Sequence, residues 1–132
     1  MLFGGKGPLG DTWLFDPSTE TWREVTPPAS PPARDLHAMV YDDANQVVLL
    51  FGGRATQEKL LNDTWIYDVK TNVWTQLTQV ATPPAMAHHA AVYDPLHGVV
   101  IVVPGIGTVH TLAFKYQPHA ALPHPISLPT GK

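Results

Sequence analysis

The chain has 132 residues, of which 44% are hydrophobic and 14% charged, and its formal net charge at pH 7 is -3. This length and apolar content suit one folded domain, and the eight Lys and Arg residues form no basic stripe for phosphates, so we expect no nucleic acid partner. No apolar run approaches the roughly 18 residues of a membrane-spanning helix, so we expect no membrane partner. The absence of Cys excludes disulfides and thiolate sites, but it does not indicate a cellular compartment.

Short strands separated by turns are expected along the whole chain. The 14 Pro and 10 Gly residues lie between short apolar runs and not in one tract, which is typical of an all-β fold. The first 35 residues contain a short apolar run that ends at Gly4 and Gly5, followed by the motif DTWLFD. In the middle of the chain the patterns predict four strands, over residues 37–41, 46–51, 63–68 and 73–77.

These four middle strands differ in their patterns. The second, residues 46–51, is a continuous apolar run that ends at Gly52 and Gly53, as expected of a strand buried on both faces. The third, residues 63–68, alternates and places Trp65 and Tyr67 on one side. Four such strands in succession predict one antiparallel sheet.

The chain repeats itself at an offset of 52 residues. Residues 11–16 (DTWLFD) return as residues 63–68 (DTWIYD), and the same shift pairs all four tryptophans. It also carries residues 31–33 onto 83–85 and His37 onto His89. Only the segment after the paired glycines differs in length, being four residues longer after Gly53 than after Gly5. Loop variation is therefore confined to one place in the repeat.

The repeat resembles that of the kelch family. The features that carry the resemblance are the run VLLFGG at 48–53, the motif DTWIYD at 63–68 and the tryptophan six residues after Asp68. The first copy shows the same order with LFGG at 2–5, Asp16 and Trp22. A third copy is recognisable from VVIVV at 99–103 but is degenerate, because Pro104 replaces the first glycine and HTLAFK at 110–115 replaces the second motif.

The resemblance implies a fragment of a kelch-type β-propeller built from four-stranded antiparallel blades. Residues 1–35 would form a partial blade with strands two to four and a connecting loop, residues 36–81 a complete blade, and residues 82–116 a partial, degenerate blade. Residues 117–132 would be a Pro-rich tail, extended or disordered. Because propellers close with about four to eight blades, we expect the remaining blades to come from a longer chain, with self-assembly as the alternative.

The repeated glycines and tryptophans are expected to have structural roles. Paired glycines permit positive φ and a close backbone approach, the aromatic residues supply area for packing one blade on the next, and the aspartates around the third strand can accept backbone N–H groups in turns. The structural repeat residues are Gly4, Gly5, Trp13, Trp22, Gly52, Gly53, Trp65 and Trp74.

The candidate binding surface consists of loops on one face. Because strand direction alternates, the loop between strands two and three and the loop that enters the next blade meet on the same side, which brings residues 53–62 beside residues 26–35 and 79–88. Loops on a rigid scaffold often carry function. The candidate partner-binding residues there are Arg34, Arg54, Gln57, Glu58, Lys59 and His88. Since neighbouring residues on a strand point to opposite faces, His88 and His89 are not expected to share a metal.

The resemblance implies a protein-interaction scaffold without enzymatic activity, cofactor or metal, and with a protein partner. The alternative is part of a propeller enzyme or carbohydrate-binding protein, galactose-oxidase-like or mutarotase-like, that lacks its full active site. The copper radical oxidases need a cysteine cross-linked to tyrosine, which this chain cannot supply, and the Glu-x-x-x-Asp pattern of iron-binding kelch proteins fails because Asn62 stands four residues after Glu58. A truncated product without function is the third interpretation.

Overall fold

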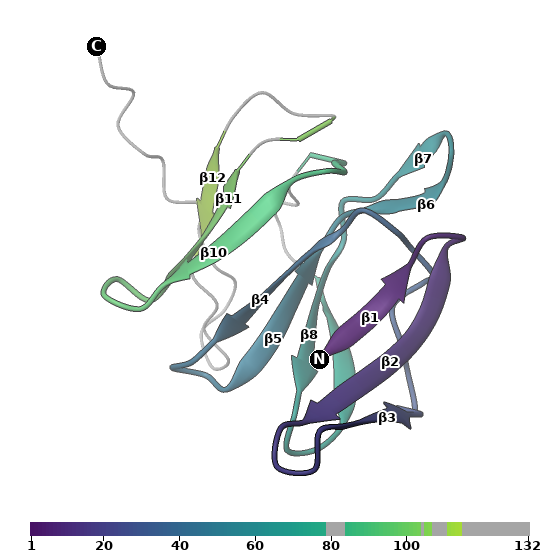
Figure 1. The fold of residues 1–132 in the computed structure, drawn as a ribbon. Helices are drawn as coiled ribbons and strands as arrows, with labels where there is room; N and C mark the ends of the chain where they lie inside the picture. Colours follow the sequence, from purple (N-terminus) through teal and green to yellow (C-terminus); the bar gives the residue numbers. More distant parts are fainter. Residues whose placement is uncertain (79–83, 104, 107–110, 115–132) are drawn as a thin grey trace.

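A computed structural model describes residues 1–78, 84–103, 105–106 and 111–114 (Figure 1). These residues form three antiparallel sheets and one small two-stranded ribbon, which confirms the all-β fold. Nothing in the described part of the chain is a helix capable of crossing a membrane. The expected tail, residues 117–132, lies outside the described residues.

The three sheets follow one another along the chain. The first sheet has the order β1 (Leu2–Gly5), β2 (Leu9–Asp16) and β3 (Thr21–Val25). The second has the order β4 (Ala38–Asp42), β5 (Val47–Phe51), β8 (Thr64–Asp68) and β9 (Val73–Leu77). The third has the order β10 (Ala90–Asp94), β11 (Val99–Val103) and β12 (Leu112–Phe114). The four strands expected in the middle of the chain are thus confirmed to within one residue at each end.

The ribbon was not expected, because its residues were assigned to a loop. It consists of β6 (Arg54–Thr56) and β7 (Lys59–Leu60) and is inserted between β5 and β8. Figure 1 shows it extending beyond the end of the second sheet. In this longer loop Arg54 pairs with Leu60 and Thr56 pairs with Lys59.

The turns that follow β2, β4, β8 and β10 share one design. Each begins with an aspartate whose Oδ1 accepts at least one backbone amide two or three residues further on: Asp16, Asp42, Asp68 and Asp94. Backbone N–H donors hold the pKa of Asp68 below its usual range. Each turn ends in a residue with positive φ, namely Glu20, Gln46, Asn72 and Gly98. The expected capping role is confirmed for Asp16 and Asp68, whereas the same role of Asp42 and Asp94 was not predicted.

The core lies between the sheets, and β5 supplies both halves of it. Leu50 is fully buried and packs with Phe3 and Trp74 between the first and second sheets. Leu49 is also fully buried but packs with Val100 and Val102 between the second and third sheets. Alternate residues of one strand thus serve two interfaces, as the continuous apolar run predicted.

Trp74 shows why the repeated tryptophans matter. Its side chain is 2% exposed, its ring lies 5.2 Å from that of Phe3, and its Nε1 donates to Thr12 Oγ1 across the sheet interface at 3.2 Å. The expected packing role is therefore confirmed for this residue. Its counterpart Trp22 is 51% exposed, because no sheet in the described structure covers that side of the first sheet.

Candidate functional site

The ribbon β6–β7 lies on the candidate loop face. Arg54 pairs with Leu60 and Thr56 with Lys59, with a register irregularity between the two pairs. The backbone N–H of Leu61 donates to the carbonyl of Gly53 at 2.9 Å and closes the base. The tip residues Gln57, Glu58 and Lys59 are exposed, as expected of candidate contact residues.

The base of the ribbon is attached to the loop that precedes the second sheet. The backbones of Asp35 and Arg54 exchange two hydrogen bonds of 3.0 and 2.8 Å, and the Arg54 guanidinium donates to both carboxylate oxygens of Asp35. The hydrogen bond from Arg54 holds the pKa of Asp35 below its usual range. Arg54 is therefore occupied by an internal ion pair, although a third of its side chain is exposed.

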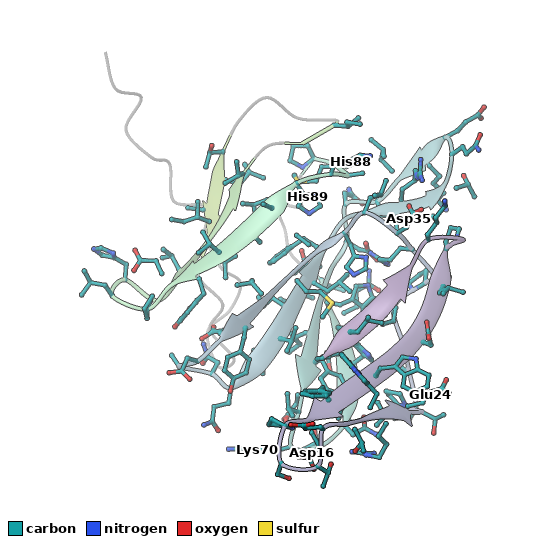
Figure 2. All side chains as sticks on the ribbon, viewed as in Figure 1. Asp16, Glu24, Asp35, Lys70, His88 and His89 are labelled. Carbon is teal, nitrogen blue, oxygen red and sulfur yellow. The ribbon has the colours of Figure 1, made fainter. Side chains whose placement is uncertain are left out.

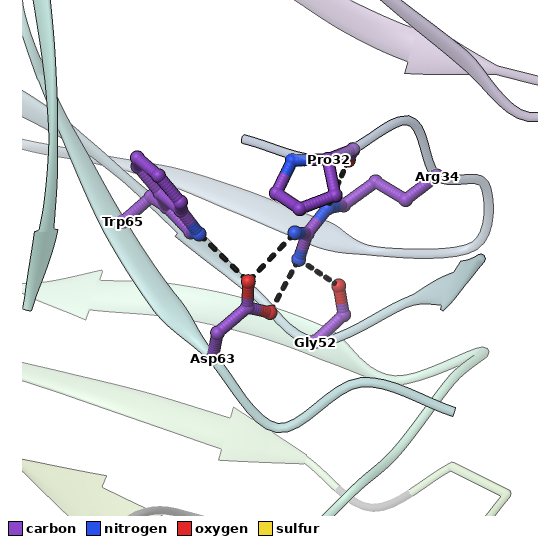
Figure 3. Close-up of polar contacts among 5 residues, drawn as sticks. All are labelled: Pro32, Arg34, Gly52, Asp63 and Trp65. Carbon is purple, nitrogen blue, oxygen red and sulfur yellow. Dashed lines mark hydrogen bonds and ion pairs between the residues drawn. The ribbon is translucent and has the colours of Figure 1, made fainter. Parts of the chain in front are cut away.

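Arg34 does not lie at the surface, so the expectation that it is presented to a partner is wrong for the structure described. Its side chain is 0% exposed, and it forms a bidentate ion pair with Asp63 at 2.6 and 2.7 Å (Figure 3). It also donates to the carbonyl oxygens of Gly52 and Pro32, each at 2.9 Å. Every donor nitrogen of the guanidinium is thus used inside the protein, which explains its burial.

Asp63 completes this junction from the second sheet. It accepts the indole Nε1–H of Trp65 at 2.7 Å in addition to Arg34. Burial acts to raise the pKa of Asp63, but the hydrogen bonds from Arg34 and Trp65 outweigh it, so the pKa lies below its usual range. The carboxylate therefore remains ionised and ties the entering loop to the third strand of the sheet.

The structure separates the two neighbouring histidines. His88 is exposed and its backbone N–H donates to the carbonyl of Leu36 at 3.1 Å, whereas His89 is 7% exposed. Burial lowers the pKa of His89. Among the described residues no group of His, Asp and Glu is arranged to hold a metal ion. Figure 2 shows His88, His89 and Asp35 toward one end of the sheets, and Asp16 and Lys70 at the other.

The loop arrangement inferred from strand direction is present where it can be followed. Besides the contact of Asp35 with Arg54, the backbone N–H of Met86 donates to Leu61 and the N–H of Gly53 donates to the carbonyl of Met86. Sequence reasoning missed the buried arginine junction. Its signal was the Asp-x-Trp motif at residues 11–13 and 63–65, which sets a carboxylate beside an indole N–H in both copies.

Comparison with known proteins identifies the family. The KLHDC2/KLHL20/DRC7 Kelch-repeats domain matches residues 1–112. An F-box/kelch-repeat protein of Arabidopsis thaliana is 34% identical over 123 residues, which cover 80% of this chain and 25% of that protein. Adagio-like protein 2 of Oryza sativa subsp. japonica is 35% identical over 102 residues, which cover 71% of this chain and 16% of that protein.

A mammalian relative is likewise covered only in part by this chain. Kelch domain-containing protein 2 of Bos taurus is 29% identical over 110 residues, which cover 80% of this chain and 26% of that protein. The chain thus spans about a quarter or less of the length of these curated relatives. With its repeated sheets and a family match over residues 1–112, the chain belongs to the kelch-repeat family.

Proposed function

We propose that this chain is the part of a larger kelch propeller that binds a protein partner through the loops on one face, without catalysing a reaction. The observation that carries the proposal is the ribbon β6–β7, whose base is fixed by Asp35 while its tip is exposed. A rigidly held, solvent-facing hairpin can present side chains to another protein at little cost in ordering.

The charge pattern of the face supports recognition by the tip and not by the base. Arg34, Asp35, Arg54 and Asp63 neutralise one another in two ion pairs. Gln57, Glu58 and Lys59 remain exposed at the tip, and His88 is exposed on the neighbouring loop. These four residues form the proposed contact set, in which Arg34 has no place and Arg54 has a supporting role.

Membership of the kelch family and the names of relatives favour this function. Relatives include an F-box/kelch-repeat protein and a dynein regulatory complex subunit, and the second name describes part of a larger assembly. The small share of each relative that the chain covers supports the view that further blades complete the propeller. We propose that those blades belong to a longer polypeptide.

Site-specific photo-crosslinking tests the proposal. A photoreactive amino acid is placed at Gln57, and in a matched variant at Lys70, which is also exposed but lies in the turn at the opposite end. We expect a specific protein adduct from position 57 and none from position 70. An adduct of equal yield from both positions, or from position 70 alone, contradicts the proposal.

A charge reversal then measures the contribution of the tip. With the captured protein in hand, the double variant Glu58→Lys/Lys59→Glu is expected to weaken binding about tenfold or more, because it inverts the local charge pattern without touching the core. The variant Lys70→Glu is the control and should leave affinity unchanged. Unchanged affinity in the tip variant refutes recognition by the ribbon.

A further inference from the structure

The first sheet contains the same carboxylate site as the second, but its arginine is missing. Asp11 Oδ2 accepts the indole N–H of Trp13 at 2.6 Å, just as Asp63 Oδ2 accepts that of Trp65. In the second sheet Asp63 Oδ1 binds Arg34 at 2.6 Å, whereas Asp11 Oδ1 is buried and has no hydrogen-bond partner among the described residues. A buried carboxylate oxygen without a donor is costly.

The strand registers show that the two sites are equivalent. Leu2 lies opposite Trp13 as Leu50 lies opposite Trp65, and Phe3 lies opposite Thr12 as Phe51 lies opposite Thr64. Arg34 reaches Asp63 from the loop that enters the second sheet. The matching position in a loop that enters the first sheet falls upstream of Met1.

A second charged position repeats in the same way. Arg54, the residue after Gly53, pairs with Asp35, which directly follows Arg34. The residue after Gly5 is Lys6, which is exposed. The first sheet therefore offers a carboxylate and an ammonium group at the two places where the second sheet meets the dipeptide Arg34–Asp35.

In the third sheet, apolar residues replace the charged residues at the positions of Arg34, Asp35 and Arg54. Met86 and Ala87 occupy the places of Arg34 and Asp35 and are 2% and 1% exposed. Ile106 stands where Arg54 stands in the second sheet, and its backbone pairs with Ala87 as that of Arg54 pairs with Asp35. In the third sheet, Ala87 and the residue that it contacts, Ile106, are thus both apolar, whereas Asp35 and Arg54 are both charged. The charge of Lys6 therefore favours an acidic residue opposite it.

The side of the first sheet that carries this site is also apolar and uncovered. Leu2, Phe15 and Trp22 are 44%, 42% and 51% exposed. Their counterparts Leu50, Tyr67 and Trp74 in the second sheet are buried against the first. The uncovered side thus has the shape and composition of an interface between sheets.

We infer that the uncovered side of the first sheet docks a further kelch blade whose trailing loop carries an Arg-Asp dipeptide. The arginine pairs with Asp11 as Arg34 pairs with Asp63, and the aspartate pairs with Lys6. This inference rests on the proposal that further blades complete the propeller, but not on the proposed contact set at the ribbon.

The first test uses the chain as it is. Asp63→Asn removes the partner of the buried Arg34, and we expect it to lower the equilibrium constant for folding at least tenfold in urea titrations. Asp11→Asn keeps an acceptor for Trp13 and removes an unpaired charge, so we expect an unchanged or increased folding constant. An equal loss in both variants overturns the inference, because Asp11 would then already have its partner.

The second test supplies the arginine. Met1 corresponds to Leu49 in the repeat, so an additional copy of residues 1–48 joined in front of Met1 continues the repeat in register and places an Arg-Asp dipeptide before the first sheet. We expect the extended protein to unfold at higher urea concentration, and Asp11→Asn now to lower its folding constant at least tenfold. The change Arg34→Met in the added copy alone should abolish that effect of Asp11→Asn.

Two results would refute the inference. One is an Asp11→Asn effect in the extended protein that is the same with arginine or methionine in the added copy. The other is a discrete oligomer of the original chain in light scattering that dissociates in Asp11→Asn, since the occupant would then be another copy. Variants at Glu58 and Lys59 should change neither measurement, which separates this test from that of the ribbon.

Discussion

Replacing Arg34 by methionine, the residue that the third sheet has at this place, should be among the most destabilising single changes in the chain. The substitution removes four hydrogen bonds, two to Asp63 and one each to the carbonyl oxygens of Gly52 and Pro32. It also leaves the Asp63 carboxylate, which is 15% exposed, with the indole of Trp65 as its remaining side-chain donor among the bonds described. Breaking a buried pair from one side costs about 3 to 5 kcal/mol.

The loss of stability expected from Arg34→Met can be distinguished from the loss that follows when a more exposed ion pair is broken. Arg54→Met breaks the pair with Asp35, but that guanidinium is 33% exposed, and ion pairs this accessible to solvent contribute little to stability. In the double variant Arg34→Met/Asp63→Asn no charge is left buried, so about half of the loss should be recovered. The three variants thus have a predicted order of stability.

Urea and thermal unfolding, both followed by tryptophan fluorescence and far-UV circular dichroism, check this order. For a chain of this size, a loss of about 3 kcal/mol lowers the melting temperature by roughly 10 °C, which is easily measured. The reasoning is refuted if Arg34→Met costs no more than Arg54→Met. It is also refuted if adding Asp63→Asn to Arg34→Met lowers stability further.

Three more predictions concern the interface, the backbone and the effect of pH. Trp74→Ala should cost about 3 to 5 kcal/mol and Trp22→Ala less than about 1 kcal/mol in urea titrations, since the first side chain is 2% and the second 51% exposed; equal losses would contradict the packing described. Gly52→Ala should cost about 1 to 3 kcal/mol, because φ is +50° and the new Cβ would lie 2.8 Å from the carbonyl oxygen of Met86; an unchanged melting temperature would refute the strain. Burial holds the pKa of His37 at about 4, below its ordinary 6.5, so the unfolded chain binds the proton first as pH falls. The free energy of unfolding should be highest above about pH 6.5 and should decrease by ~3 kcal/mol as the pH falls to about 4. A His37→Gln variant that shows the same decrease would mean that another group is responsible.

The sequence repeat predicted the sheets well because each strand pattern occurs in more than one copy. The run at 46–51 and the motif at 63–68 each recur, and their strands were placed to within a residue. Periodicity also placed Leu49 and Leu50 on opposite buried faces, since side chains alternate along a strand. Patterns of this kind predict a strand from the residues of the strand alone.

The burial of Arg34 could not be predicted from the residues around it in the sequence. An arginine in a Pro-rich loop is ordinarily solvent-exposed, and its burial depends on a carboxylate 29 residues away and on a carbonyl of Gly52. Asp63 was likewise expected to cap a turn, as Asp68 does, but it accepts side-chain donors instead. Both roles arise from contacts between segments that only the folded chain brings together.

The ribbon escaped prediction for a different reason. Its residues include charged and polar side chains with no alternation, and its pairing follows from the closure of its ends by Gly53 and Leu61 and by Asp35 and Arg54. A loop whose two ends are held together by neighbouring backbone can pair with itself even without an alternating pattern of apolar residues.

That closure gives the hairpin tip a practical value. The hydrogen bonds at its base satisfy the backbone where the ribbon leaves the sheet, so whatever lies between Thr56 and Lys59 makes no demand on the interior. Lengthening such a loop costs only about 0.6 kcal/mol for each doubling. The position is therefore a ready insertion point for an epitope or a library of displayed peptides, carried on the scaffold without redesign of its core.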